Sequence, residues 1–247
     1  NTNDGTYGDS PDRWWCSAYL NYADWVPAAS TQCNTGRLIE TPGSLRAIKT
    51  LGSDVVAYKE RSMYLGRYAG PPVVWDWTLI PGEIGCASQE AIANIGTAHV
   101  FIGYEDIYLF DGSRPVPIGA PIRGWFFSDL DPTYRYLINH SHDRVNSLVY
   151  FHYPRAGSTG TLNGCIVYNY KSNKWGLAHR SIECPVEYIS GGYTWDTLPI
   201  PTWDTWPSIA YDSPFWTASS QYPSYFGTDH KVYSLTGQSA SASMTPG

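Results

Sequence analysis

A short phrase, an apolar residue followed by tyrosine, recurs four times in this 247-residue chain and closes a strand-like stretch each time. The copies are Met63-Tyr64, Ile107-Tyr108, Val167-Tyr168 and Val232-Tyr233. Successive copies are about 44, 60 and 65 residues apart, and a repeat of roughly 40–50 residues with insertions, built of short strands, is typical of β-propeller blades. The phrase therefore predicts an all-β, β-propeller-like chain with about four recognisable antiparallel blades.

Alternating apolar residues and tight turns divide the chain into short strands. We expect the first blade at 45–52, 54–58, 63–66 and 73–77, and the second at 89–95, 99–102 and 107–110. The third is expected at 134–140, 147–153, 164–170 and 175–180, and the fourth from 187–190 through 232–235. Each repeated pair should lie on a sheet of its own, with its apolar residue on one face and its Tyr on the other.

One short helix is expected between the second and third blades. Ile122, Trp125, Phe126 and Leu130 follow helical spacing, which predicts a helix over 121–130. We divide the chain into an N-terminal aromatic segment (1–32, with a strand pair possible at 14–25), blades (33–240) and the start of a further region or tail (241–247). Both ends read as cuts in a longer polypeptide.

Charged residues are few and aromatic residues many. Charged residues make up 15% of the chain, well below the roughly 25% of an ordinary soluble domain. The 11 Trp and 20 Tyr suit large protein contacts, although strand-rich proteins contain many of both in any case. With 22 acidic against 16 basic residues and no basic cluster, tight binding to nucleic-acid phosphates is not expected.

The five cysteines predict reduced thiols. Their number is odd and no pair has CxxC spacing, so we expect mostly buried thiols and no intrachain disulfide. We also expect no secretory signal and no membrane-spanning segment, because no apolar run approaches the ~18 residues of a membrane span.

Residues 140–143 are the strongest candidate for chemistry. His140 and His142 would share one face of a strand and could bind a metal, with Asp143 behind them, but the same residues also suit a polar turn. The carboxylates that a glycosidase would need all fall in turns, where Asp is common for backbone reasons. Nucleophile-elbow, Walker and dinucleotide motifs are missing from the sequence. We therefore expect neither an enzyme nor a cofactor.

An aromatic insertion over 194–216 is the second candidate site. Its aromatic residues could stack on sugar rings, or they could pack on a neighbouring subunit or on their own blade. Pro199, Pro201 and Pro207 stiffen the segment and favour packing. The candidate protein-contact residues are Trp195, Trp203, Trp206, Phe215 and Trp216.

Several phrases, in order, resemble a family of tailed-bacteriophage virion proteins. They are residues 34–43 (NTGRLIETPG), 64–72 (YLGRYAGPP), 80–85 (IPGEIG), 107–115 (IYLFDGSRP) and 209–216 (IAYDSPFW). Together they extend over roughly 33–240. The chain resembles the β-propeller part of a short-tailed-phage tail nozzle or tail tube protein, and is similar in role to packaged-DNA stabilisation (head-completion) proteins.

The resemblance implies a structural protein of the phage tail, made in the host cytoplasm. Copies would form a ring, a hexamer in this family, that retains and conducts double-stranded DNA without tight binding. Its neighbours would be adaptor or portal-proximal tail proteins and tail fibres or spikes. The resemblance supplies no catalytic or metal-binding residues. The alternative is a carbohydrate-binding or carbohydrate-cleaving β-propeller that uses the insertion.

A ring that passes DNA should present neutral or acidic turns to the channel, because each Lys or Arg contact with phosphate would hinder movement. The candidate channel-facing acids are Glu105, Asp106, Asp129, Asp131 and Asp229. The competing interpretation is that the net charge of −6 serves solubility alone.

Overall fold

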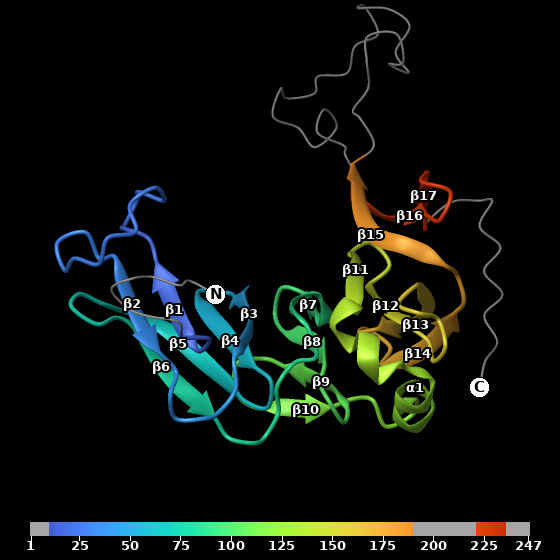
Figure 1. Cartoon of the computed structure of the whole chain (residues 1–247), viewed down its shortest axis with the longest axis horizontal. Coiled ribbons are helices and arrows are strands. Elements are labelled where there is room, and N and C mark those ends of the chain that lie inside the picture. The colour runs from blue at the N-terminus through green and yellow to red at the C-terminus, as the bar shows by residue number, and fades with distance from the viewer. Residues whose placement is uncertain (1–9, 190–220, 236–247) are drawn as a thin grey trace, which may run out of the picture.

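The computed structural model describes residues 10–189 and 221–235, which form antiparallel sheets that follow one another in chain order (Figure 1). A two-stranded sheet, the N-terminal pair, contains β1 (Arg13–Cys16) and β2 (Asn34–Arg37). The first sheet contains β3 (Leu45–Leu51), β4 (Asp54–Lys59), β5 (Met63–Gly70) and β6 (Val74–Ile80). The second contains β7 (Ile92–Asn94), β8 (His99–Ile102), β9 (Ile107–Phe110) and β10 (Pro115–Pro117).

The third sheet has seven strands and lies at the opposite end from the N-terminal pair (Figure 1). Its members are β11 (Asn139–Asp143), β12 (Leu148–Pro154), β13 (Leu162–Asn169), β14 (Lys174–Ala178), β15 (Ile182–Ile189), β16 (Gln221–Gly227) and β17 (Val232–Ser234). Three helical segments are described: η1 (Gln89–Ala91), α1 (Arg123–Asp129) and η2 (Pro132–Leu137). The all-β prediction and the short helix are confirmed.

Three strand predictions are wrong. Residues 134–140 were expected as one strand, but η2 runs to Leu137, because Pro132 suits a helix start and the Asp131 carboxylate accepts from the Thr133 amide. The expected strand at 89–95 likewise opens with η1, and β7 begins at Ile92. At the N-terminus β1 pairs with β2, beyond position 32, rather than within 14–25.

The fourth blade is not a separate sheet. Strands β15, β16 and β17 continue the third sheet, because Ile182 pairs with Leu162 of β13. Val232-Tyr233 therefore shares a sheet with Val167-Tyr168, with two strands between them. It lies on an outermost strand, and both its side chains are exposed. None of the described sheets closes on itself.

The first two repeated pairs each divide their side chains between two hydrophobic cores. Met63 faces the core between the first and second sheets, and Tyr64 faces the core shared with the N-terminal pair. Ile107 faces the core between the second and third sheets. Tyr108 packs on the preceding core, and Tyr168 again faces back towards the preceding sheet. The expected alternation is confirmed for Met63-Tyr64 and Ile107-Tyr108, and the Tyr faces the preceding sheet in all three pairs.

The sheets come together at their first strands. Strands β3, β7 and β11, each the first in chain order in its sheet, include the closest strand contacts between sheets. Between the second and third sheets, α1 adds Phe126, which is fully buried and meets Tyr153 edge to face at 4.9 Å. The three sheets are thus joined by continuous apolar packing.

Tryptophans seal the contact between the N-terminal pair and the first sheet. Trp14 is paired with Gly36 and Trp77 with Gly66 on the adjacent strands, and a Cβ at either glycine would lie within 2.9 Å of the indole. The two indoles then approach each other at 5.6 Å. Glycine opposite an aromatic residue lets the ring lie flat across the neighbouring strand.

Candidate interaction surface

The connection between β1 and β2 presents a group of exposed apolar side chains. Leu20 is 90% exposed and Tyr22 87%, and Tyr19, Trp25 and Val26 are also exposed. Backbone bonds hold this loop in shape, from the Ala18 amide to the Asp24 carbonyl and from the Tyr19 amide to the Thr31 carbonyl, both at 2.8 Å. An ordered loop that exposes several large apolar residues is typical of a contact surface.

Beside this loop is a groove of about 390 Å³, the N-terminal groove. Its walls include Tyr19 and Leu20 from the loop, Tyr68 from β5, and Val74 and Trp75 from β6. Tyr68 and Trp75 meet edge to face at 6.0 Å. The Tyr68 hydroxyl donates to Gln32 Oε1 at 2.5 Å, and none of the residues that line the groove is charged.

Backbone strain shapes one wall of the groove. Val74 has φ +65°, a conformation that β-branched residues rarely adopt. The Trp75 amide donates to the Val73 carbonyl at 2.9 Å and closes this tight turn. Strain of this kind costs on the order of 1–3 kcal/mol and clusters at functional positions.

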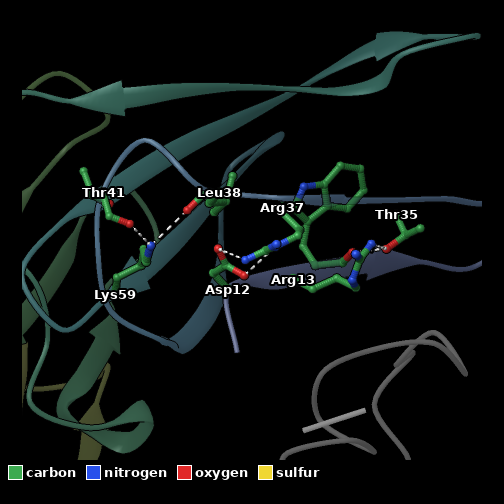
Figure 2. Close-up of polar contacts among 8 residues, drawn as sticks. Asp12, Arg13, Thr35, Arg37, Leu38, Thr41 and Lys59 are labelled. Atoms are coloured by element: carbon green, nitrogen blue, oxygen red, sulfur yellow. Dashed lines mark hydrogen bonds and ion pairs between the residues drawn. The ribbon is translucent and has the colours of Figure 1, made fainter. Parts of the chain in front are cut away.

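A buried lysine anchors the loop after β2. Lys59, at the end of β4, is fully buried, and its Nζ donates to the carbonyl oxygens of Leu38, at 2.9 Å, and Thr41 (Figure 2). Burial lowers the pKa of Lys59, although nearby Asp12 acts in the opposite direction. The ammonium thus holds a structural position.

An ion pair between Asp12 and Arg37 lies next to Lys59 and joins the segment before β1 to the end of β2. Arg37 donates to both carboxylate oxygens of Asp12, from Nε at 2.9 Å and from Nη2 at 3.2 Å (Figure 2). This two-point contact lowers the pKa of Asp12 and raises that of Arg37. The Leu38 amide also donates to the Asp12 carbonyl, so the charged groups here serve the fold.

Four of the five candidate channel acids form ion pairs, and in two of them, Asp106 and Asp129, the carboxylate is largely buried. Asp106 is buried and accepts from the Ile107 amide at 2.7 Å and from Arg123 at 3.0 Å. Asp129 accepts from Arg155 Nε at 2.7 Å and from the Tyr153 hydroxyl at 2.9 Å. Burial alone would raise the pKa of Asp129, but these two hydrogen bonds hold it below its usual value.

The other three acids lie nearer the surface. Asp131 caps η2, Glu105 is 80% exposed and lies 3.9 Å from Arg61, and Asp229 accepts from the Tyr233 hydroxyl at 2.6 Å. That last hydrogen bond lowers the pKa of Asp229. The five acids are therefore spread over different turns.

The two histidines considered as metal ligands, His140 and His142, lie on β11 and have other contacts. His140 Nδ1 is 2.7 Å from the Glu90 carbonyl oxygen, and His142 Nε2 is 3.2 Å from the Tyr170 hydroxyl. Within 10–189 and 221–235, no three His, Cys, Asp or Glu side chains gather as metal ligands would. Residues 139–143 form a strand rather than the alternative polar turn.

All five cysteines, which lie in the described residues, are free thiols. Cys86 and Cys165 are buried, and burial raises the pKa of Cys86 to about 12 and that of Cys165 still further. Cys33 Sγ donates to the Cys16 carbonyl oxygen at 3.1 Å. Thiols with raised pKa values are poor nucleophiles at neutral pH.

The candidate contact residues of the insertion, Trp195, Trp203, Trp206, Phe215 and Trp216, lie outside the described residues. The N-terminal groove is what the sequence interpretation missed. The sequence predicts an aromatic segment here, but the groove forms only when β5 and β6 approach this loop. The available signal was the run of apolar residues at 18–20 and 25–28 without a strand or helix period.

In the part of the chain that the structure describes, no helix has the length and apolar character needed to cross a membrane. The comparisons with known proteins found no match: no family model matches the chain, and no curated protein matches it either.

Proposed function

We propose that this chain is a structural subunit of a bacteriophage tail, in which copies form a ring that retains and conducts DNA. One structural observation carries the proposal: an ordered apolar surface at the N-terminal end of the molecule, with Leu20 90% exposed and no charged residue lining its groove. Contact with a neighbouring protein would remove this apolar surface from water. The phrases that resemble nozzle and head-completion proteins indicate which kind of neighbour this is.

The arrangement of the sheets supports a propeller-like body within that ring. Successive four-stranded meanders approach one another at their first strands and share a core at each junction. Propeller blades are arranged in the same way around an axis. In the proposed assembly, adaptor or portal-proximal proteins and fibres or spikes bind the outer surfaces.

Assembly and DNA binding test the proposal. The purified full chain is expected to form closed rings, seen by mass photometry and by electron microscopy. Its affinity for duplex DNA at physiological salt should be no tighter than about 10⁻⁴ M, the weak end of the non-specific range. A chain that stays monomeric at ~100 µM, or that binds DNA tightly with a steep salt dependence, contradicts the proposal.

The alternative, a carbohydrate-binding or carbohydrate-cleaving propeller, depends on the insertion at 194–216, outside the described residues. A glycan array and a reducing-sugar assay on the same protein test it directly. Binding or release of sugar would favour that function over the tail subunit.

A further inference from the structure

We propose that the N-terminal groove receives the proline-rich and tryptophan-rich segment 194–208 of a second copy of this chain. The inference rests on the ring proposed above and names the contact that would join neighbouring copies. The segment reads TWDTLPIPTWDTWPS, with Leu198-Pro199-Ile200-Pro201 at its centre.

The groove is suited to an apolar peptide. Its walls of Tyr19, Leu20, Tyr68 and Trp75 offer ring faces and edges but no charge. A phosphate or a metal ion would find no counter-charge there. A sugar would need several side-chain hydrogen-bond partners, whereas the Gln32 side-chain oxygen already accepts from Tyr68. An apolar chain gains most, because it covers aromatic surface that is otherwise in water.

Segment 194–208 has matching chemistry. Within 194–208 the charged residues are Asp196 and Asp204, which lie on either side of the uncharged run Leu198-Pro199-Ile200-Pro201. Proline-rich peptides bind aromatic grooves well because their restricted backbone loses little entropy on binding. The groove and the run at 198–201 are therefore matched in polarity.

The positions of the two elements favour a second copy as the source. The groove adjoins β1 and β6 at one end of the molecule, whereas residues 190–220 join β15 to β16, which lie at the other end (Figure 1). When the groove of one copy binds the segment of another, the resulting dimer still has one free groove and one free segment. Each can bind a further copy, so the same contact can be repeated. Such head-to-tail contacts generate closed rings when the rotation allows.

A mixing experiment on the full chain tests this contact. Leu20→Asp places a charge in the groove, and Leu20 is exposed with φ +58°, a conformation that Asp adopts more readily than Leu. Leu198→Asp with Ile200→Asp alters the segment. Each variant alone should be monomeric. An equimolar mixture should give dimers and nothing larger, because one intact groove can meet one intact segment.

Val145→Asp is the matched control, since Val145 is a 72% exposed apolar residue remote in sequence from both elements. This variant should assemble like the wild-type chain. Circular dichroism melts should show that all variants fold. Mass photometry provides the readout.

A labelled peptide of residues 194–208 separates the groove from the ring. Fluorescence anisotropy should show that the peptide binds the monomeric variant Leu198→Asp with Ile200→Asp, whose groove is intact. The affinity should fall at least tenfold when this variant also carries Leu20→Asp. Wild-type rings that persist unchanged in Leu20→Asp overturn the groove contact and leave the ring standing. A wild-type chain that is monomeric overturns the ring, and with it a second copy as the occupant. Equal peptide binding with and without Leu20→Asp overturns the groove as the binding site.

Discussion

Lys59 Nζ donates to the carbonyl oxygen of Leu38 at 2.9 Å from a side chain with no exposed surface. A lysine this deeply buried is rare unless its charge is compensated. Here two backbone carbonyls and nearby Asp12 compensate it. The contact fastens the chain leaving β2 to the end of β4.

Lys59→Met should lower the free energy of unfolding by about 1–3 kcal/mol, because it leaves buried carbonyl oxygens without a donor. Urea denaturation followed by tryptophan fluorescence measures this. Lys49→Met is the control, since Lys49 is partly exposed and lies 3.6 Å from Glu90, a contact worth less than about 1 kcal/mol. Equal losses in the two variants would contradict the role given to Lys59.

Gly85→Ala should destabilise the fold by about 1–3 kcal/mol or more, as expected for overpacking. A Cβ at Gly85 would overlap the backbone carbonyl oxygens of Lys59 and Glu60, which cannot rotate away. Gly124→Ala is the opposite case, because Gly124 lies within α1 and the position of an added Cβ is open. That change should raise stability by up to about 1 kcal/mol. Thermal melts that rank the two variants the other way would refute this packing.

Acid should destabilise the third sheet through His142 and His152. Burial lowers the pKa of each to about 4 from the ordinary 6.5. The unfolded chain therefore binds more protons below pH 6.5, so their contribution to stability falls as pH drops towards 4 and levels off below that value. Urea midpoints at pH 7.5, 6, 5 and 4 measure the slope.

His152→Gln should flatten this slope, whatever its effect at pH 7.5. Val145→Gln is the control, because Val145 is exposed and has no titratable group, and its slope should match that of the wild-type chain. The same slope in His152→Gln as in the wild-type chain would rule out His152 as a source of the acid sensitivity.

Asp129→Asn should lower stability by about 1–3 kcal/mol, since it removes the charge that holds Arg155 and the buried Tyr153 hydroxyl. Asp131→Asn should be nearly neutral, because Asn caps a helix start as well as Asp does. Calorimetry on both variants measures the difference. A larger loss at Asp131 than at Asp129 would show that the assignment of these roles is wrong.

The strands of the first sheet were predictable because both of its faces are covered. Because β4 and β5 are buried on both faces, each contains a short continuous run of apolar residues, and tight turns mark their ends. Helix α1 was also predictable from the sequence, because the buried Phe126 lies among apolar residues at helical spacing. In these elements the spacing of apolar residues along the chain was enough to predict the secondary structure.

Pairing between distant segments was not predictable. The partner of β1 lies about twenty residues away, beyond a loop with no regular period, and β15 joins the third sheet through a single pair, Leu162 with Ile182. The candidate acids show the same limit, because Asp129 has its ion-pair partner, Arg155, 26 positions away. The preference of Asp for turns explains why an Asp occurs at these positions, but it does not predict which Arg or Lys forms an ion pair with it.

The division of Met63 and Tyr64 between two cores has a mechanical consequence. Neighbouring residues of one strand belong to different interfaces, so β5 connects the N-terminal pair on one face to the second sheet on the other. We expect a displacement of the N-terminal pair to move Tyr64 and, through β5 and Met63, to reach the second sheet. Force applied at the exposed end of this molecule would then be carried from sheet to sheet rather than absorbed in one loop.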